Sequence, residues 1–184
     1  MTATVEKKRF TYEDYLKTPD DRRYELIEGE LIMTPSPVPN HQRISRKIAL
    51  ILEKFVSENS LGEIFYAPLD VHLDDETVFE PDILFISKER AHIIGEKNIQ
   101  GAPDLVIEIL SETTAYNDVI KKKKIYAKFG VKEYWIADPM EKTVEIYSLK
   151  DGVFILEKSF SESHILESSL LAGLNIKLPY VFTF

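Results

Sequence analysis

The stretch PDLVIEILSETTAYNDVIKKKKIYAKFGVKEYWIADP, residues 103–139, decides the fold of this chain. It begins with a run of aliphatic residues that contains one glutamate, Glu108, and it continues with a lysine-rich segment and a second apolar run. Such apolar runs are typical of strands that are covered on both faces, and the segment between them lacks glycine and proline until Gly130. The stretch therefore predicts a central strand, a helix over residues 114–129 that Gly130 ends, and a second strand.

Glu108 is out of place in the first of these strands. Alternation puts it on the same face as Val106 and Leu110, among aliphatic side chains. An isolated buried carboxylate is driven toward its neutral form, at a cost in folding free energy. Glu108 therefore needs a partner or a cation, which makes it a candidate site residue.

Asp82 repeats this anomaly in the preceding segment VFEPDILFIS, residues 78–87, which alternation predicts to be a single strand. Pro81 beside it has no N–H donor, which indicates a bulge or a strand edge at the acid. Two such acids that share one divalent cation would remove the cost of burying both charges.

Four consecutive lysines, residues 121–124, occupy the predicted helix. They lie 100° apart around its axis, so at least one of them points inward. Lys122 and Lys123 both have apolar neighbours one turn away, and periodicity leaves the choice between them open. The alternative is that all four are solvated side chains whose stems lie along a packed helix.

The rest of the chain predicts an α+β (α/β) protein that forms one domain over residues 1–184, with a flexible arm at residues 1–10. The expected elements, in chain order, are a short helix with Thr11 as N-cap in TYEDYLKTPDD, a β-hairpin in YELIEGELIMTP, a long helix over residues 44–56 with Asn40 as N-cap, strands in GEIFYA and PLDVHLD, and C-terminal strands in TVEIYSLK, GVFILEKSF and LNIKL.

Composition excludes several classes of protein. The chain has 184 residues and 44% hydrophobic residues, which is enough for a core, and it has no cysteine, which excludes disulfides and thiolate chemistry. A formal net charge of −8 argues against tight nonspecific binding of nucleic acid, although it leaves room for a local basic surface or a metal ion. Because no apolar run is long enough to cross a bilayer and MTATVEKKRF lacks the core of a signal peptide, we expect a cytoplasmic protein with no membrane partner.

The motifs that are absent from the sequence exclude several kinds of catalytic site. The sequence lacks G-x-S-x-G, G-x-x-x-x-G-K and G-x-G-x-x-G, and no two of its histidines have the i, i+4 spacing of a helical zinc site. Two strand carboxylates and a lysine remain. Carboxylate oxygens suit Mg²⁺ or Mn²⁺, which can activate a water and neutralise charge on a phosphate, while a lysine holds the nucleophile or the phosphate. The residues thus predict phosphodiester hydrolysis.

The order of motifs also resembles a known family. YELIEGEL, PLDVHL, EPDILFIS, GAPDLVIEILS, DVIKKKKIYAKFGV and EYWIADP resemble, over residues 11–178, the Uma2 family of restriction-endonuclease-like proteins, which is abundant in cyanobacteria. That family belongs to the PD-(D/E)XK nuclease superfamily. The resemblance implies a restriction-endonuclease-like core with a mixed central β-sheet flanked by helices, here with an N-terminal β-hairpin and extra C-terminal strands. It also implies a Mg²⁺- or Mn²⁺-dependent endonuclease that acts on DNA.

The same resemblance assigns the site. Pro81-Asp82 matches the PD element and Glu108 the second acid, so Asp82 and Glu108 are expected to be catalytic and to bind the metal. The superfamily lysine would fall at position 110, where this chain has Leu110. In the family pattern a lysine lies on the next helix, four residues after an aspartate and four before a tyrosine. The corresponding residues are Asp118, Lys122 and Tyr126, so the resemblance prefers Lys122 over Lys123 as the catalytic lysine.

Other polar residues are weaker candidates for groups that orient the metal ligands. Asp104 and Asp70 are expected at strand ends, with a place beside the site as the alternative. His41 is expected to be structural or solvated, again with a place beside the site as the alternative. Asp118 and Tyr126 enter this group through the family pattern, and Glu25 and Glu28 are weaker still.

A second class of function stays open. Because a fold alone does not establish an activity, a noncatalytic nucleic-acid or protein interaction domain that has kept the nuclease fold is the alternative. For the nuclease, a homodimer is expected by analogy, since two sites related by a two-fold axis can cut two strands.

Overall fold

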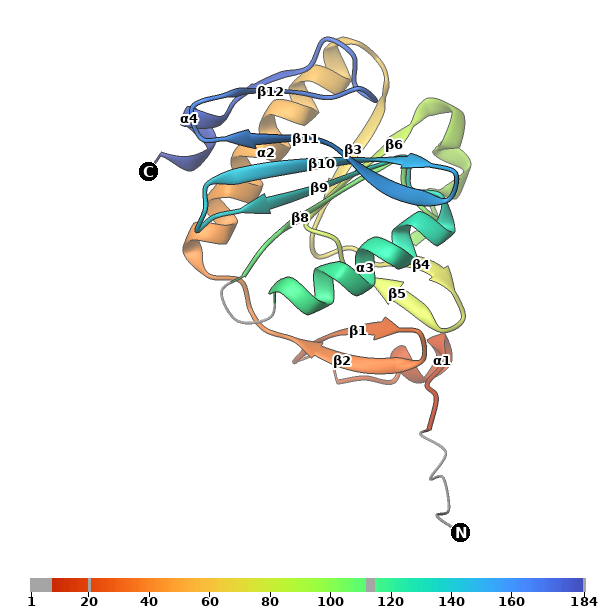
Figure 1. Ribbon diagram of the computed structural model, residues 1–184. Coiled ribbons are helices and arrows are strands. Elements are labelled where there is room, and N and C mark those ends of the chain that lie inside the picture. The colour runs from red at the N-terminus through yellow and green to blue at the C-terminus, as the bar shows by residue number, and fades with distance from the viewer. Residues whose placement is uncertain (1–7, 20, 112–114, 184) are drawn as a thin grey trace.

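The computed structural model describes residues 8–19, 21–111 and 115–183, with side chains left out at residues 115–118 (Figure 1). Its helices are α1 Tyr12–Tyr15, α2 Pro39–Glu58, the 3₁₀-helix η1 Lys88–Ile93, α3 Ala115–Phe129 and α4 Leu178–Phe182. Its strands are β1 Arg23–Ile27, β2 Glu30–Thr34, β3 Gly62–Tyr66, β4 Val71–Asp74, β5 Thr77–Phe79, β6 Ile83–Ser87, β7 Ile99–Gln100, β8 Leu105–Ile109, β9 Glu133–Asp138, β10 Thr143–Lys150, β11 Val153–Ser161, β12 Ile165–Glu167 and β13 Asn175–Lys177.

A mixed sheet forms the centre of the protein. Within the described residues it has six strands in the order β11-β10-β9-β8-β6-β3, of which β8 and β9 are parallel and the other neighbours antiparallel. The predicted strand–helix–strand unit is confirmed, because α3 connects the parallel pair β8 and β9. Gly130 ends α3 with a φ of +86°, a conformation that glycine adopts at little cost.

Helices cover this sheet on both faces, with α2 on one face and α3 on the other (Figure 1). The apolar stripe of α2, which includes Ile44, Ile48 and Leu52, packs against Ile107 and Trp135. The predicted long helix is therefore confirmed, but its N-cap is wrong. Val38 is the N-cap, because Pro39 takes the first helical position and its ring already fixes a helical φ.

The opposite face of the sheet carries α3, whose residues Ile125, Tyr126 and Ala127 pack on Val106 and Tyr134. This packing fixes how α3 is rotated about its axis. The residue one turn before Tyr126 on the same face is Lys122, so the rotation that buries Tyr126 also turns Lys122 inward.

The N-terminal hairpin belongs to a second sheet, with the order β2-β1-β5-β4-β7 among the described strands. The predicted hairpin is confirmed, with positive φ at both turn residues, Glu28 (48°) and Gly29 (80°), as two-residue turns of this kind require. Of the predicted arm, residues 1–7 lie outside the described residues. Arg9 forms an ion pair with Glu76, and the N–H of Phe10 donates to Gly29 at 2.9 Å.

The segment 78–87 is not one strand, contrary to the prediction. Residues up to Phe79 form β5 in the second sheet, and residues from Ile83 form β6 in the central sheet. Pro81 has no N–H for a ladder, so pairing breaks there and the chain crosses between sheets. Asp82 therefore lies at the junction of the two sheets, where the chain enters β6.

Two of the predicted C-terminal strands, TVEIYSLK and GVFILEKSF, extend the central sheet as β10 and β11. The third, LNIKL, contains β13, which does not join that sheet but pairs with β12 in a separate two-stranded sheet. β10 and β11 form a hairpin whose turn residues Asp151 and Gly152 have φ angles of 49° and 78°. Trp135 is fully buried, and its indole N–H donates to Glu133 Oε1 at 2.7 Å. No helix in the part of the chain that the structure describes is long and apolar enough to cross a membrane.

Candidate active site

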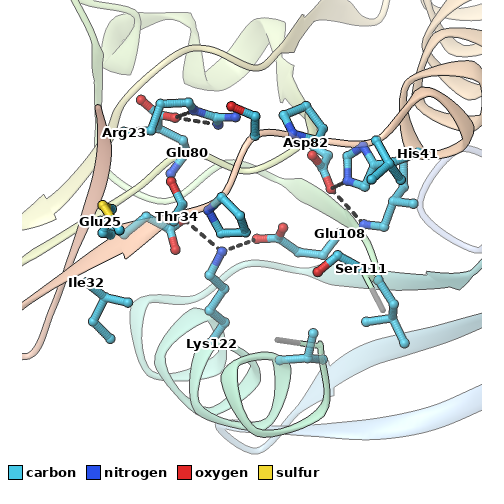
Figure 2. Close-up of a pocket in the computed structure, with 18 of the residues that line it drawn as sticks. Arg23, Glu25, Ile32, Thr34, His41, Glu80, Asp82, Glu108, Ser111 and Lys122 are labelled. Atoms are coloured by element: carbon cyan, nitrogen blue, oxygen red, sulfur yellow. Dashed lines mark hydrogen bonds and ion pairs between the residues drawn. The ribbon is translucent and has the colours of Figure 1, made fainter. Parts of the chain in front are cut away.

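A pocket of about 360 Å³ opens where the hairpin, the first turn of α2, the end of β8 and α3 come together (Figure 2). The elements that meet here are far apart in the sequence. The charged and titratable residues that line the pocket are Arg23, Glu25, His41, Glu80, Asp82, Glu108 and Lys122.

Glu108 lines this pocket and is buried. Its Oε1 accepts hydrogen bonds from Lys122 Nζ at 3.2 Å and from the Tyr126 hydroxyl at 2.9 Å. Lys122 and Tyr126 are one turn apart on α3, so a single helix face holds this carboxylate. Both bonds go to the same oxygen, which fixes the orientation of the carboxylate.

Lys122 is the lysine that points inward. Its Nζ is buried between Glu25 Oε1, at 2.7 Å, and Glu108 Oε1, at 3.2 Å, as Figure 2 shows. Lys123 points elsewhere, because its Nζ lies 3.2 Å from the centre of the Tyr147 ring. The choice that periodicity left open is therefore answered by the structure.

Asp82 enters the pocket opposite Glu108. The last pair in the ladder between β6 and β8 joins Ile83 to Ile107, so one further step places Asp82 across from Glu108. Asp82 Oδ2 accepts hydrogen bonds from the N–H of Ile109 at 2.8 Å and from His41 Nε2 at 3.1 Å. The backbone of β8 and the first turn of α2 thus hold the second carboxylate.

Burial and neighbouring charges together set the pKa values of Glu108 and Lys122. The pKa of Glu108 is raised to about 7, chiefly by burial; the charge of Lys122 opposes this rise, and the nearby charges of Asp82 and Glu25 add to it. For Lys122, burial alone would lower the pKa, but the carboxylates of Glu108 and Glu25 outweigh burial and raise it. The lysine is therefore a cation, and its ammonium group pairs with two carboxylates, those of Glu25 and Glu108.

His41 also favours its charged form. Burial alone would lower its pKa, but the hydrogen bond and the charge of Asp82 outweigh burial and raise it. His41 is only 7% exposed, so a solvated histidine, which is part of the sequence-based expectation, is wrong, and the alternative of a place beside the site is what the structure shows. Its imidazole lies beside Asp82 and can hold that carboxylate in place.

Glu25 is the pocket residue that sequence reasoning underrated. It is buried on β1, and its Oε1 accepts hydrogen bonds from Lys122 and from the N–H of Glu80, the latter at 3.1 Å. Glu80 in turn accepts a hydrogen bond from Arg23 at 2.7 Å. Alternation along YELI could have shown that Glu25 faces away from Leu26, but it could not show which sheet the hairpin joins.

The other predicted residues lie apart from the pocket lining. Asp104 is fully buried before the start of β8, where it accepts hydrogen bonds from the Ser87 N–H at 2.8 Å and forms an ion pair with Lys132 at 2.7 Å. Asp70 accepts a hydrogen bond from the Tyr15 hydroxyl at 2.8 Å. The side chain of Asp118 lies outside the described residues.

The donor set fits a hard divalent cation. Asp82 and Glu108 bring two carboxylates to the same pocket, where burial raises the pKa of Glu108 and the charge of Asp82 adds to that rise. Among the residues that the structure describes, no three His, Asp or Glu side chains converge as a complete metal cage. One or two carboxylates with water and substrate in the remaining positions are the shell that Mg²⁺ prefers.

Known proteins are similar to this chain in sequence and in fold. A family model, "Uma2: Putative restriction endonuclease", matches residues 12–179. An uncharacterized protein of Synechocystis sp. is 24% identical over 176 residues, which cover 93% of this chain and 99% of that protein. The crystal structure of a "putative nuclease belonging to DUF820" from Anabaena variabilis has a TM-score of 0.79 at 24% identity, and the match covers 94% of this chain and 97% of that one. This likeness shows that the fold is the restriction-endonuclease-like fold predicted from the sequence.

Proposed function

Because this chain belongs to the Uma2 family, we propose that it is a metal-dependent endonuclease that hydrolyses phosphodiester bonds in DNA. One observation supports this proposal most strongly: Lys122 Nζ lies 3.2 Å from Glu108 Oε1. The superfamily places its lysine two residues after the second acid, where this chain has Leu110. Lys122 on α3 thus contacts Glu108, the acid that a lysine at position 110 would have accompanied.

Asp82 and Glu108 would hold Mg²⁺ or Mn²⁺. A bound cation of this kind activates water and neutralises the charge that develops on the phosphate oxygens. The protein contributes orientation. Tyr126 fixes Glu108 through the 2.9 Å hydrogen bond, and His41 with the N–H of Ile109 fixes Asp82. Groups of this kind, one contact away from the metal ligands, commonly set their orientation and affinity.

Lys122 would supply positive charge at the scissile phosphate. Its raised pKa keeps it an ammonium, and therefore a donor, at neutral pH. In hydrolysis, water forms the new bond to phosphorus, the ester bond to the leaving oxygen breaks, and a proton passes to that oxygen. A buried ammonium group stabilises the negative charge that builds up during this exchange.

The proposal includes a partner and an assembly. Duplex DNA is the expected substrate, and a homodimer is the simplest arrangement for cutting both strands, because it presents two sites related by a two-fold axis. The net charge of −8 means that affinity for DNA must come from local contacts and from the cation.

The experiment is cleavage of supercoiled plasmid, linear duplex and single-stranded RNA with Mg²⁺, with Mn²⁺ and with EDTA. We expect nicked or linear DNA with either cation, none with EDTA, and loss of cleavage in Glu108→Gln and Asp82→Asn. Equal cleavage by wild type and both variants would reveal a contaminant and contradict the proposal. DNA binding without cleavage would favour the noncatalytic interaction domain, and RNA cleavage alone would overturn the choice of substrate.

A further inference from the structure

Glu25 lies in the candidate site but has no part in the proposed reaction. It is 5% exposed, on the middle of β1, in a hairpin that belongs to the second sheet. A buried carboxylate is costly unless it is paired, so its partners indicate what it does.

Two donors fix the Glu25 carboxylate. Lys122 Nζ donates to its Oε1 at 2.7 Å, and the N–H of Glu80 donates to the same oxygen at 3.1 Å. β5, which precedes Glu80, pairs with β1 through Leu26 and Val78. The N–H of Glu80, which holds the Glu25 carboxylate, thus follows a strand that is paired with β1, the strand of Glu25. The carboxylate is therefore held in place before any substrate binds.

Lys122 is shared between two acids, and its contact with Glu25 is the shorter. The distance is 2.7 Å to Glu25 and 3.2 Å to Glu108. A lysine paired with Glu108 alone would neutralise the carboxylate that the cation needs, and would compete with that cation. Glu25 offers Lys122 a second anion on the far side of the pocket.

We propose that Glu25 is a positioning residue that holds Lys122 within the site while Glu108 is released to bind the cation. The inference rests on the proposed function, because it assumes that Glu108 is a metal ligand. It predicts that Glu25 acts on cation binding through Lys122, and not through its own charge or by direct ligation.

A double-mutant cycle tests this prediction. Mn²⁺ affinity is measured by calorimetry, without DNA, for wild type, Glu25→Gln, Lys122→Met and the double variant. We expect Glu25→Gln to weaken Mn²⁺ binding about tenfold, because Lys122 then pairs with Glu108 alone. In the Lys122→Met background, the same substitution should change the affinity by less than about twofold.

Two further variants separate contact from charge and from folding. Glu25→Asp keeps the charge but shortens the side chain, so we expect Mn²⁺ binding to weaken as it does in Glu25→Gln. Glu28→Gln removes a charge from the exposed turn of the same hairpin, and we expect unchanged affinity. Denaturation curves for each variant establish that the protein measured is folded.

The possible results distinguish failure of this inference from failure of the proposed function. An equal loss of affinity from Glu25→Gln with and without Lys122 would overturn the inference, since Glu25 would then act as a ligand or by its charge alone. Wild-type affinity in Glu25→Asp would also overturn it. In both cases, Mn²⁺ binding by the wild type would leave the proposed function standing. Failure of the wild type to bind Mn²⁺ would refute the proposed function and this inference together.

Discussion

Lys122 on α3 and Glu108 on β8 form an ion pair of 3.2 Å inside a single strand–helix–strand unit. The helix that connects the two parallel strands also carries Lys122, whose ammonium group pairs with the acid on the first of these strands. Because Tyr126 is packed in the core one turn further along, the inward direction of Lys122 is a consequence of how α3 is buried. The fold and the candidate site are thus specified by the same residues.

Lys122→Met should destabilise the protein far more than Lys123→Met. Without the ammonium group, Glu25 and Glu108 remain buried with no cation, which costs about 3–5 kcal/mol of unfolding free energy. Lys123 lies on the Tyr147 ring, a contact worth about 0.5–1 kcal/mol. Urea denaturation in EDTA measures both values. Saturating Mg²⁺ should recover part of the loss in Lys122→Met, because it binds the folded state. Equal stability of the two variants would contradict this account.

His41→Gln should weaken cation binding without unfolding the protein. The imidazole donates to the Asp82 carboxylate at 3.1 Å, and loss of such a contact typically costs about 10–100-fold in metal affinity. Calorimetric titration with Mn²⁺ gives the affinity. His92 is exposed on η1, so His92→Gln is the matched control and should bind Mn²⁺ as the wild type does. An unchanged affinity in His41→Gln would show that His41 does not orient Asp82.

Asp104→Asn should reduce stability at neutral pH and lose most of that effect in acid. Burial would raise the pKa of Asp104, but hydrogen bonds from Lys132 and Ser87 outweigh burial and lower it. A lowered pKa in the folded state stabilises the protein above the unfolded pKa of about 3.9, and this contribution is lost as the pH falls through the folded value. Thermal melts of both proteins from neutral pH down to acid measure the difference. A difference that stays constant across this range would contradict the prediction.

Leu110→Lys should partly restore cleavage to Lys122→Met. Position 110 lies on the same face as Glu108, two residues further along, which is where the resemblance to PD-(D/E)XK nucleases predicts a lysine. Leu110 is only partly buried, so a longer side chain has room to reach the pocket that it lines. We expect the double variant to cut DNA about tenfold faster than Lys122→Met. If the double variant cuts DNA no faster than Lys122→Met, then cleavage depends on where α3 places its lysine and not only on a positive charge near Glu108.

The central unit could be predicted from the sequence because its signals are local. Aliphatic alternation marks β8, the absence of glycine and proline marks α3, and Gly130 ends it. The same alternation identified Glu108 as a buried acid. Position within one helix could not distinguish Lys122 from Lys123, because both have apolar neighbours; the family pattern was needed to prefer one of them.

Long-range pairing explains what the sequence did not show. Segment 78–87 has the alternation of a single strand, but β5 pairs with the hairpin and β6 with β8, so the chain divides at Pro81. Glu25 reaches the site only because the hairpin joins that second sheet, 97 residues before Lys122. Alternation predicts on which face of a sheet a side chain lies, but it does not predict which other strand its own strand pairs with.

The rate of DNA cleavage by Lys122→Met, compared with Lys123→Met, tests the central claim most directly. Both changes remove one lysine from the same helix, but only Lys122 contacts Glu108. Single-turnover cleavage of plasmid with Mg²⁺ should be slower by about 10²–10³-fold in Lys122→Met, the cost of losing one positioned group that stabilises the transition state. It should be within about twofold of wild type in Lys123→Met. Equal rates for the two variants would contradict the account.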